Sequence, residues 1–356
     1  MTLYAVATLI QGCAGEHPSH APVTSPIEGR ALIERALPPG VADRSGWIED
    51  LHASFVALKI PESHDNICAV VAVTEQESSF HVDPVIPNLG SIAWHEIDER
   101  AAHAGLPISM VHGVLELKSP NGESYSERIR EARTEKQLSD IFEDFTGTIP
   151  LGRTLFASLN PIHTRGPMQV NVAFAERFAQ STPYPFALKG SIADELFTRR
   201  GSVYFGTAHL LAYAAPYDRF LFRFADFNAG QYSSRNAAFQ AAVARASGRP
   251  LLADGALVPH DGESGSTEIA VAALAPRLRL DQDAIHGALE EGRSHDFERS
   301  ALYRAVFELA ERHAGRPLPR AVIPTIKLQG PKITHALTTD WYAHRVEQRF
   351  ERCLMR

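Results

Sequence analysis

Two carboxylates follow the most apolar run of the chain. The run NICAVVAV at 66–73 leads through Thr74 into EQESSF, which places Glu75 and Glu77 at the end of an expected helix. The negative end of the helix dipole and apolar neighbours both disfavour a charged carboxylate, and so favour a group that acts as a general acid. Glu77 is therefore the first candidate for acid–base chemistry, with a solvated helix end as the alternative. Glu75 faces another side of the helix and is expected to be a solvated or capping carboxylate.

Two later patches offer ligand contacts. GPMQV at 166–170 is expected to open the helix NVAFAERFAQ: Gly166 suits a tight turn, Pro167 a first helical turn, and Met168 and Gln169 supply one apolar and one polar contact. Phe-Asn-Ala-Gly at 227–230 ends the apolar segment YFGTAHLLAYAAPYDRFLFRFAD. Taken singly, GPMQV is better explained as a plain loop-to-helix junction, and Phe-Asn-Ala-Gly as an ordinary helix C-terminus.

Together and in this order, ESSF, GPMQV and GTAHLLAYAAPYDRFLFRFADFNAG resemble the motifs of the lytic transglycosylases of the soluble-lytic type, in the lysozyme-like superfamily. That family has Glu-Ser at the end of a buried helix, then Gly-Leu-Met-Gln, then Ala-Tyr-Asn-Ala-Gly. Here Pro167 stands in place of the Leu. The resemblance covers discontinuous parts of 65–240. The whole chain also resembles an uncharacterised family of proteobacterial lipoproteins, known as a domain of unknown function.

The resemblance implies a reaction on peptidoglycan glycan strands. Glu77 would protonate the oxygen between N-acetylmuramic acid and N-acetylglucosamine, then take a proton from the muramoyl 6-hydroxyl to close a 1,6-anhydro ring. The substrate's N-acetyl group would support the cationic sugar, so neither a second carboxylate nor a cofactor is implied. No Cys or His spacing matches a metal site. The residues implied to bind the sugars are Ser78, Met168, Gln169, Phe227, Asn228 and Gly230.

Two departures from the family affect the expected site. The long gap between the first two patches implies a helical insertion at about 85–160, placed on the surface or over the groove. Phe227 stands where the family has Tyr, which removes a hydroxyl that Tyr232 or Tyr125 is a candidate to supply. Asp226 is expected to face solvent; the alternative is a second carboxylate in the groove, which would permit hydrolysis by water.

Helical patterns dominate the elements that must position these residues, so the predicted fold class is mainly α: a lysozyme-like helical domain with a helical insertion and a helical C-terminal extension. Asp65 is expected to cap the helix from 66 to about 77, although its run of Val also suits a strand. The segment GRPLLADGALVPHDGESGS at 248–266 suggests a boundary. The predicted parts are a linker and first helix at 14–40, the lysozyme-like domain at 41–250 and a helical region at 251–356. Other helices are expected near 26–37, 43–60, 90–104, 107–116, 123–145, 167–180, 202–229, 236–247, 281–292 and 297–315.

Composition and the N-terminus bear on location. The net charge of −7 argues against a nucleic-acid partner. The start of the chain, MTLYAVATLIQGCAG, is typical of a signal peptide with a lipobox, at 1–13, which predicts a lipid on Cys13 and a position on the periplasmic face of the outer membrane. The alternative is a merely apolar N-terminus with an incidental Cys. Cys68 is expected to be a small buried residue. The sequence permits a disulfide between Cys68 and Cys353 but does not establish it.

Three functional hypotheses remain. The first is a lytic transglycosylase, the second a lysozyme-type hydrolase, and the third an envelope lipoprotein that binds peptidoglycan without cleaving it. All three require that Glu77, Gln169 and Asn228 share one groove. If they lie apart, the motif resemblance is a coincidence.

Overall fold

A computed structural model describes residues 26–148, 160–258, 265–328 and 336–356. The chain is mainly helical, which confirms the predicted fold class, and the only sheet in the described ranges is a two-stranded hairpin. The predicted signal peptide, Cys13 and the linker at 14–25 lie outside these ranges. None of the described helices is long and apolar enough to cross a membrane.

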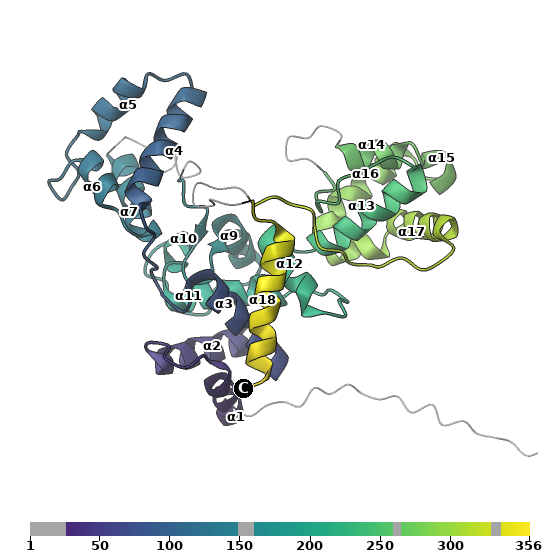
Figure 1. Ribbon diagram of the computed structural model, residues 1–356, viewed down its shortest axis with the longest axis horizontal. Helices are drawn as coiled ribbons and strands as arrows, with labels where there is room; N and C mark the ends of the chain where they lie inside the picture. The colour runs from purple at the N-terminus through teal and green to yellow at the C-terminus, as the bar shows by residue number, and fades with distance from the viewer. Residues whose placement is uncertain (1–25, 149–159, 259–264, 329–335) are drawn as a thin grey trace, which may run out of the picture.

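A central core carries the expected catalytic patches. Its helices are α1 (Pro26–Ala36), α2 (Arg44–Leu58), α3 (His64–Ser78), α9 (Val172–Ser181), α10 (Ile192–Glu195), α11 (Arg199–Leu211), α12 (Phe220–Ala229) and α18 (Thr339–Leu354). They share one hydrophobic cluster that runs from Ile33 to Cys353. In Figure 1, α18 (yellow) lies beside α3 and α12, against which it packs, although it comes from the far end of the chain.

Helix α3 is buried on all sides in its middle. Every residue from Ile67 to Thr74 has no exposed surface, which explains why no amphipathic periodicity is visible in its sequence. The segment is a helix, not the alternative strand. Its N-cap is Ser63, whose side chain accepts a hydrogen bond from the backbone N–H of Asn66, so the expected cap Asp65 lies instead in the first turn.

Four helices form an insertion lobe with a cluster of its own. They are α4 (Leu89–His103), α5 (Ile108–Leu115), α6 (Tyr125–Glu131) and α7 (Glu135–Gly147), and their buried side chains include Leu89, Tyr125 and Leu138. The lobe stands apart from the central core at one end of the molecule (Figure 1). The expected helix at 123–145 is two helices, α6 and α7, each with its own capping box.

The C-terminal lobe does not begin at the expected boundary. Its cluster already includes residues of α13 (Ser233–Ser247), which packs against α17 (Ala301–Ala314), and it excludes α18. Helix α18 returns to the central core, where Cys353 forms a disulfide with Cys68. A division at 250 therefore separates helices that share a core. The other elements of the lobe are α14 (Ser266–Ala272), α15 (Ala275–Leu278), α16 (Gln282–Glu290), η2 (Glu291–Arg293) and η3 (His295–Arg299).

The segment GPMQV forms a hairpin turn and not a first helical turn. Strands β1 (Thr164–Arg165) and β2 (Val170–Asn171) pair antiparallel, and α9 begins only after Asn171, whose side chain caps it. Gly166 has φ 72°, and a Cβ there would lie 1.9 Å from the carbonyl oxygen of Leu196. Glycine is required at this position on both grounds, which accounts for the first residue of the motif.

The expected helix at 202–229 is also two helices. Helix α11 ends at Leu211 and α12 begins at Phe220, because Pro216 lies in the segment between them. In α11, Gly206 faces Met168, whose Sδ would lie 2.4 Å from a Cβ at that position. The hairpin is thereby seated directly on α11. This contact brings GPMQV against Gly206, the first residue of the motif that ends in Phe-Asn-Ala-Gly.

Candidate functional site

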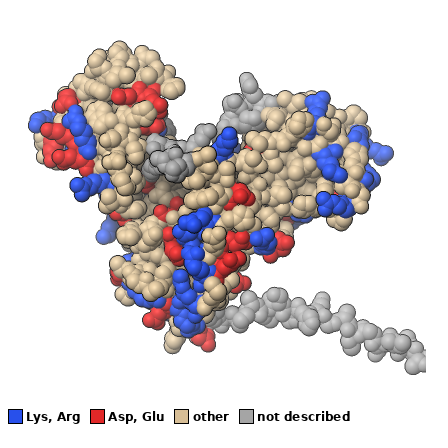
Figure 2. All heavy atoms as spheres, viewed as in Figure 1, with Lys and Arg blue, Asp and Glu red and all other residues tan. Residues whose placement is uncertain are grey.

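A cleft of about 2690 Å³ lies where the central core and the two lobes meet. Figure 2 shows the molecule hollowed between the insertion lobe and the C-terminal lobe. The central core supplies the floor, including Glu77 and the ends of the hairpin and of α12. One wall consists of α4, α5 and α7, and the other of residues 252–258, 289–293 and 325–327.

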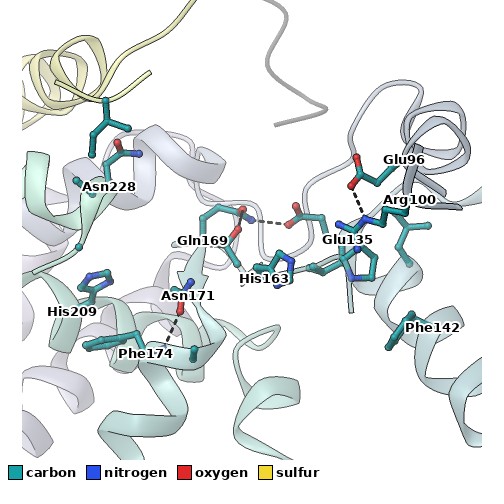
Figure 3. Close-up of a pocket in the computed structure, with 18 of the residues that line it drawn as sticks. Glu96, Arg100, Glu135, Phe142, His163, Gln169, Asn171, Phe174, His209 and Asn228 are labelled. Atoms are coloured by element: carbon teal, nitrogen blue, oxygen red, sulfur yellow. Dashed lines mark hydrogen bonds and ion pairs between the residues drawn. The ribbon is translucent and has the colours of Figure 1, made fainter. Parts of the chain in front are cut away.

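The three patches meet in this cleft. Glu77, Gln169 and Asn228 all line it, together with Phe227 and Gly230. Gln169 and Asn228 lie on the floor in Figure 3, from the hairpin and from the end of α12. The requirement that all three functional hypotheses share is met.

Glu77 is half-buried and bonded to a residue that the sequence did not indicate. Its Oε1 accepts a hydrogen bond from the hydroxyl of Tyr342, on α18. Burial, followed by the neighbouring Glu77 carboxylate, raises the pKa of Tyr342 well above its usual value, so the phenol keeps its proton and acts as a donor. Tyr232 is not placed to supply the hydroxyl, because it does not line the cleft and packs edge-on against Tyr213.

Gln169 joins the floor to the insertion wall. Its Nε2 donates to Oε2 of Glu135 at 2.8 Å, and its Oε1 accepts from the hydroxyl of Thr164 at 2.9 Å (Figure 3). The backbone of Gln169 has φ 50°, the left-handed conformation at the last position of the turn. Glu135 is buried at the start of α7. The amide is thereby fixed in orientation at the surface of the cleft.

Helix α18 also reaches the third patch. The hydroxyl of Thr339 donates to Oδ1 of Asn228 at 2.8 Å, which leaves the amide nitrogen of Asn228 as a donor. The same helix therefore contacts Glu77 through Tyr342 and Asn228 through Thr339. The sequence signal that could have revealed α18 is the helical spacing of Tyr342, Val346 and Cys353.

Two expected sugar-binding residues lie outside the cleft lining. Met168 is fully buried against Gly206, and its backbone N–H donates to the hydroxyl of Ser202 at 3.0 Å. Ser78 is 8% exposed and its hydroxyl donates to the carbonyl oxygen of Thr74 within α3. Both side chains serve the packing of the floor, so the expectation that they contact sugar is corrected.

Glu75 is not a solvated carboxylate. Its Oε1 lies 3.2 Å from Nη2 of Arg352 and 3.8 Å from Nε of Arg349, and Oε2 lies 4.0 Å from Nη2 of Arg356. All three arginines belong to the end of the chain, on or just after α18. The carboxylate therefore anchors α18 to α3 and does not face solvent.

Asp226 does not face solvent either. It has no exposed surface and accepts hydrogen bonds from the hydroxyls of Tyr213 and Tyr217 and from the backbone N–H groups of Tyr232 and Ser234. Burial raises its pKa to about 6 in spite of these donors. It does not line the cleft, so its role is to join α12 to α13. The alternative of a second carboxylate in the groove is excluded for Asp226.

Phe227 belongs to an aromatic stack on the floor. The ring of His209 lies between Phe174, at 4.3 Å and 20°, and Phe227, at 5.0 Å and 33°. Burial, with a smaller effect of Arg177, lowers the pKa of His209 to about 4, so the ring is neutral near pH 7. His209 lines the cleft, and its Nδ1 has no hydrogen-bond partner among the described residues. Sequence reasoning missed this residue, which had only an apolar helix around it.

The other carboxylates of the cleft have partners. Glu96 accepts from Arg100 at 2.7 Å, and Asp254 accepts from Gln240 at 2.8 Å. Across the described ranges, no group of three or more His, Cys, Asp or Glu side chains is placed to hold a metal ion. The arrangement offers the pair of Glu77 and Tyr342 and two orienting amides beside the aromatic stack of Phe174, His209 and Phe227.

These features define a mainly helical protein with a polar cleft floor assembled from distant parts of one chain. The chain belongs to the family described as "Protein of unknown function (DUF1615)", which matches residues 40–356. It is 46% identical to "Uncharacterized protein YaiW" of Escherichia coli (strain K12) over 356 residues, covering 99% of this chain and 97% of that protein. No solved structure matches the chain. The expected membership of a family of unknown function is confirmed, whereas the resemblance to lytic transglycosylases stays a prediction.

Proposed function

We propose that this protein cleaves the glycan strand of peptidoglycan as a lytic transglycosylase, with Glu77 as the acid and base. The observation that carries the proposal is the meeting of Glu77, Gln169 and Asn228 in one cleft. These residues come from three motifs separated by up to 150 residues in the sequence. A chance resemblance gives no reason for the three to converge.

Each group on the floor has a role in the proposed reaction. Glu77 protonates the glycosidic oxygen as the bond to the muramoyl C1 breaks, and the N-acetyl oxygen of the substrate stabilises the cationic sugar. Glu77 then accepts the proton of the muramoyl 6-hydroxyl, whose oxygen bonds to C1 and closes the anhydro ring. Tyr342 keeps the carboxyl group oriented through both steps. The amides of Gln169 and Asn228 orient the N-acetyl group.

The positions of the carboxylates favour ring closure over hydrolysis. An inverting hydrolase needs a second carboxylate to activate water, and a retaining one needs it as a nucleophile. Asp226 lies outside the cleft lining and is held by four donors. Glu135 lines the cleft but is buried and accepts a hydrogen bond from Gln169. The substrate's own N-acetyl group is therefore the better partner for Glu77.

A non-catalytic glycan-binding protein is the second candidate. Phe227 favours it, because this residue lacks the hydroxyl of the family's Tyr and packs on His209. Tyr342 supports the catalytic proposal instead, because it places a phenol on Glu77 from another element.

The location is proposed on two grounds. The N-terminal segment with Cys13 suggests a lipid anchor on the periplasmic face of the outer membrane. The disulfide between Cys68 and Cys353 supports an oxidising compartment such as the periplasm.

Digestion of purified peptidoglycan tests the activity. The full chain carrying Cys13→Ser, which removes the acceptor of the lipid, is incubated with the polymer and the products are identified by mass spectrometry. We expect anhydromuropeptides from this protein and none from Glu77→Gln. The matched control is Glu96→Gln, which removes another carboxyl group of the same cleft and should leave the products unchanged.

The outcomes separate the hypotheses. Reducing ends in place of anhydro sugars, lost in Glu135→Gln as well as in Glu77→Gln, would establish a two-carboxylate hydrolase. No products from a folded protein that still sediments with the polymer would establish the binding protein. Anhydro products that persist in Glu77→Gln would disprove the assigned role of Glu77.

A further inference from the structure

The insertion wall of the cleft exposes an unusual amount of apolar surface. Leu106 precedes α5, and Met110 and Val114 lie one turn apart on it; all three line the cleft. They are 50%, 63% and 39% exposed. A contiguous group of large apolar side chains that remains open to solvent is a common mark of a binding surface.

The neighbouring helices extend this surface into a trough. Ile92 and Ile97 of α4 and Phe142 and Phe145 of α7 are half-buried and line the same cleft. Phe142 lies on the insertion side of the cleft in Figure 3, opposite the floor with Asn228 and His209. The trough is thus bounded by α4, α5 and α7.

The charges in the trough compensate each other. Glu96 and Arg100 are its ionised lining residues on α4, and they form an ion pair with 2.7 Å between Oε1 and Nε (Figure 3). On α7, Glu135 also lines the cleft, but it is buried and accepts a hydrogen bond from Gln169. Among the described lining residues of α4, α5 and α7, every ionisable side chain therefore already has a partner. The part of a ligand that occupies the trough is therefore uncharged and apolar.

The trough opens directly onto the polar floor. Glu77, Gln169 and Asn228 line the same continuous cleft as Met110 and Phe142. An occupant of the whole cleft must carry polar groups at one end and apolar groups at the other. We propose that the trough binds the hydrocarbon chain of an amphiphile whose sugar head group lies over the floor.

This inference deepens the proposed function. It identifies the substrate as a glycan that carries a lipid chain, and only the sugar part rests on the glycan-cleaving activity. The proposal that the hydrocarbon chain binds in the trough rests on the apolar residues of the insertion wall. An amphiphile is preferred over an apolar helix of a partner, because the trough is continuous with the floor lined by Glu77, Gln169 and Asn228, and an amphiphile supplies both a polar and an apolar end.

Alkyl maltosides of increasing chain length test the trough directly. The full chain carrying Cys13→Ser is titrated by calorimetry with octyl, decyl and dodecyl maltoside, each below its micelle-forming concentration. We expect the affinity to rise by about fourfold per added methylene, as for transfer of a hydrocarbon chain out of water. Maltose, which has the head group alone, should bind far more weakly than any of them.

A pair of variants on one helix provides the control. Met110→Asp places a charge in the trough and should weaken dodecyl maltoside binding by at least about tenfold. Ile108→Asp lies on the same helix and is 42% exposed, but it does not line the cleft and should bind like the parent protein. Both sites are exposed, so both variants should fold, which circular dichroism checks.

Three results would overturn the proposal. Affinity independent of chain length would show that the trough takes no hydrocarbon, and equal losses in both variants would place binding elsewhere. A concentration-dependent dimer that disappears in Met110→Asp would assign this face to a second copy of the chain. Chain-length-dependent binding that Met110→Asp weakens, found in a protein that releases no anhydromuropeptides, would leave this inference standing without the proposed function, so the two failures are distinguishable.

Discussion

The floor and the insertion wall of the cleft are held in different ways. The floor depends on α18, which is joined to α3 by a disulfide and by the ion pairs of Glu75, and to the ends of α3 and α12 by Tyr342 and Thr339. The wall has its own small hydrophobic cluster. Its polar contacts with the hairpin are the hydrogen bond between Gln169 and Glu135 and a 3.8 Å ion pair between Arg165 and Glu143.

The two regions therefore differ in what their packing must achieve. Glu77 and Asn228, the groups proposed to act on the substrate, are both fixed by hydrogen bonds from α18. The wall needs only to present apolar area, for which local packing suffices. Variants that release α18 should therefore damage the floor and leave the wall intact, whereas variants of the wall should leave the floor intact.

The largest effect is expected on removing the disulfide. The double variant Cys68→Ser, Cys353→Ser opens a link across 285 residues and should lower the free energy of unfolding by roughly 4 kcal/mol, since a loop of this length strongly restricts the unfolded chain. Urea unfolding measures the loss. Hydrogen exchange should locate it in α3 and α18, with the amides of α4 to α7 unchanged. A loss spread evenly over both regions would contradict the comparison.

The next largest effect concerns the neutral histidine in the floor. His209 has a pKa of about 4 in the folded protein and about 6.5 when exposed. The contribution of the neutral ring to the free energy of unfolding is therefore complete above pH 6.5 and is lost as the pH falls towards 4. Relative to His209→Phe, the parent protein should lose up to about 3 kcal/mol of unfolding free energy over this interval.

The comparison with the variant is needed because Asp226 acts in the opposite direction. Its pKa of about 6 lies above that of an exposed aspartate, so the folded protein binds a proton there first and gains stability as the pH falls below 6. Asp226 is common to both proteins and cancels in the difference. Equal pH dependence of the two unfolding curves would show that His209 is not neutral and buried in solution.

Much of the floor could be predicted from sequence, because its motifs are local. Glu77 lies in the last turn of a helix whose apolar run is visible in the sequence, and Gly166 of GPMQV predicts a tight turn. What failed depended on tertiary contacts. Nothing local distinguishes Met168 in a core from Met168 in a groove, and only the packing on Gly206 decides it. Glu75 looked solvated because its three arginine partners lie more than 270 residues away.

The role of α18 was not predictable from the motifs. Its sequence TDWYAHRVEQRFERCL is rich in charge, as surface helices are, and its contacts with Glu77 and Asn228 involve single hydroxyl groups. The available signals were the spacing of Tyr342, Val346 and Cys353 and the presence of a second cysteine at Cys68. The wall was predicted as a helical insertion. Its packing into a separate lobe was not predicted, because it depends on contacts between α4 and α6, which are not adjacent in the sequence.

A smaller effect is expected from removing one hydroxyl from the floor. Tyr342→Phe deletes the donor to Glu77 and should cost about 2 kcal/mol of unfolding free energy, the usual range for a hydrogen bond to a charged group. Cleavage should fall by about tenfold.

The matched control removes a hydroxyl from the wall. The hydroxyl of Tyr125 is buried and has no hydrogen-bond partner within bonding distance among the described residues. Tyr125→Phe should therefore be neutral or slightly stabilising, with unchanged cleavage. If Tyr342→Phe lowers stability but leaves cleavage unchanged, Tyr342 supports α18 without positioning Glu77.

The smallest effect is expected at the exposed end of α18. Arg352 pairs with Glu75 at 3.2 Å, but its side chain is 48% exposed, so Arg352→Ala should cost less than about 1 kcal/mol. Arg312→Ala breaks a more exposed pair with Glu308 in the C-terminal lobe and should cost as little or less. Of these two ion pairs, the one with Arg352 holds α18 against α3, whereas the one with Arg312 lies within α17. If Arg352→Ala loses cleavage at nearly unchanged stability, the floor requires α18 to be held in position along its full length. If cleavage is unchanged, the disulfide and Tyr342 are sufficient to hold α18 in position.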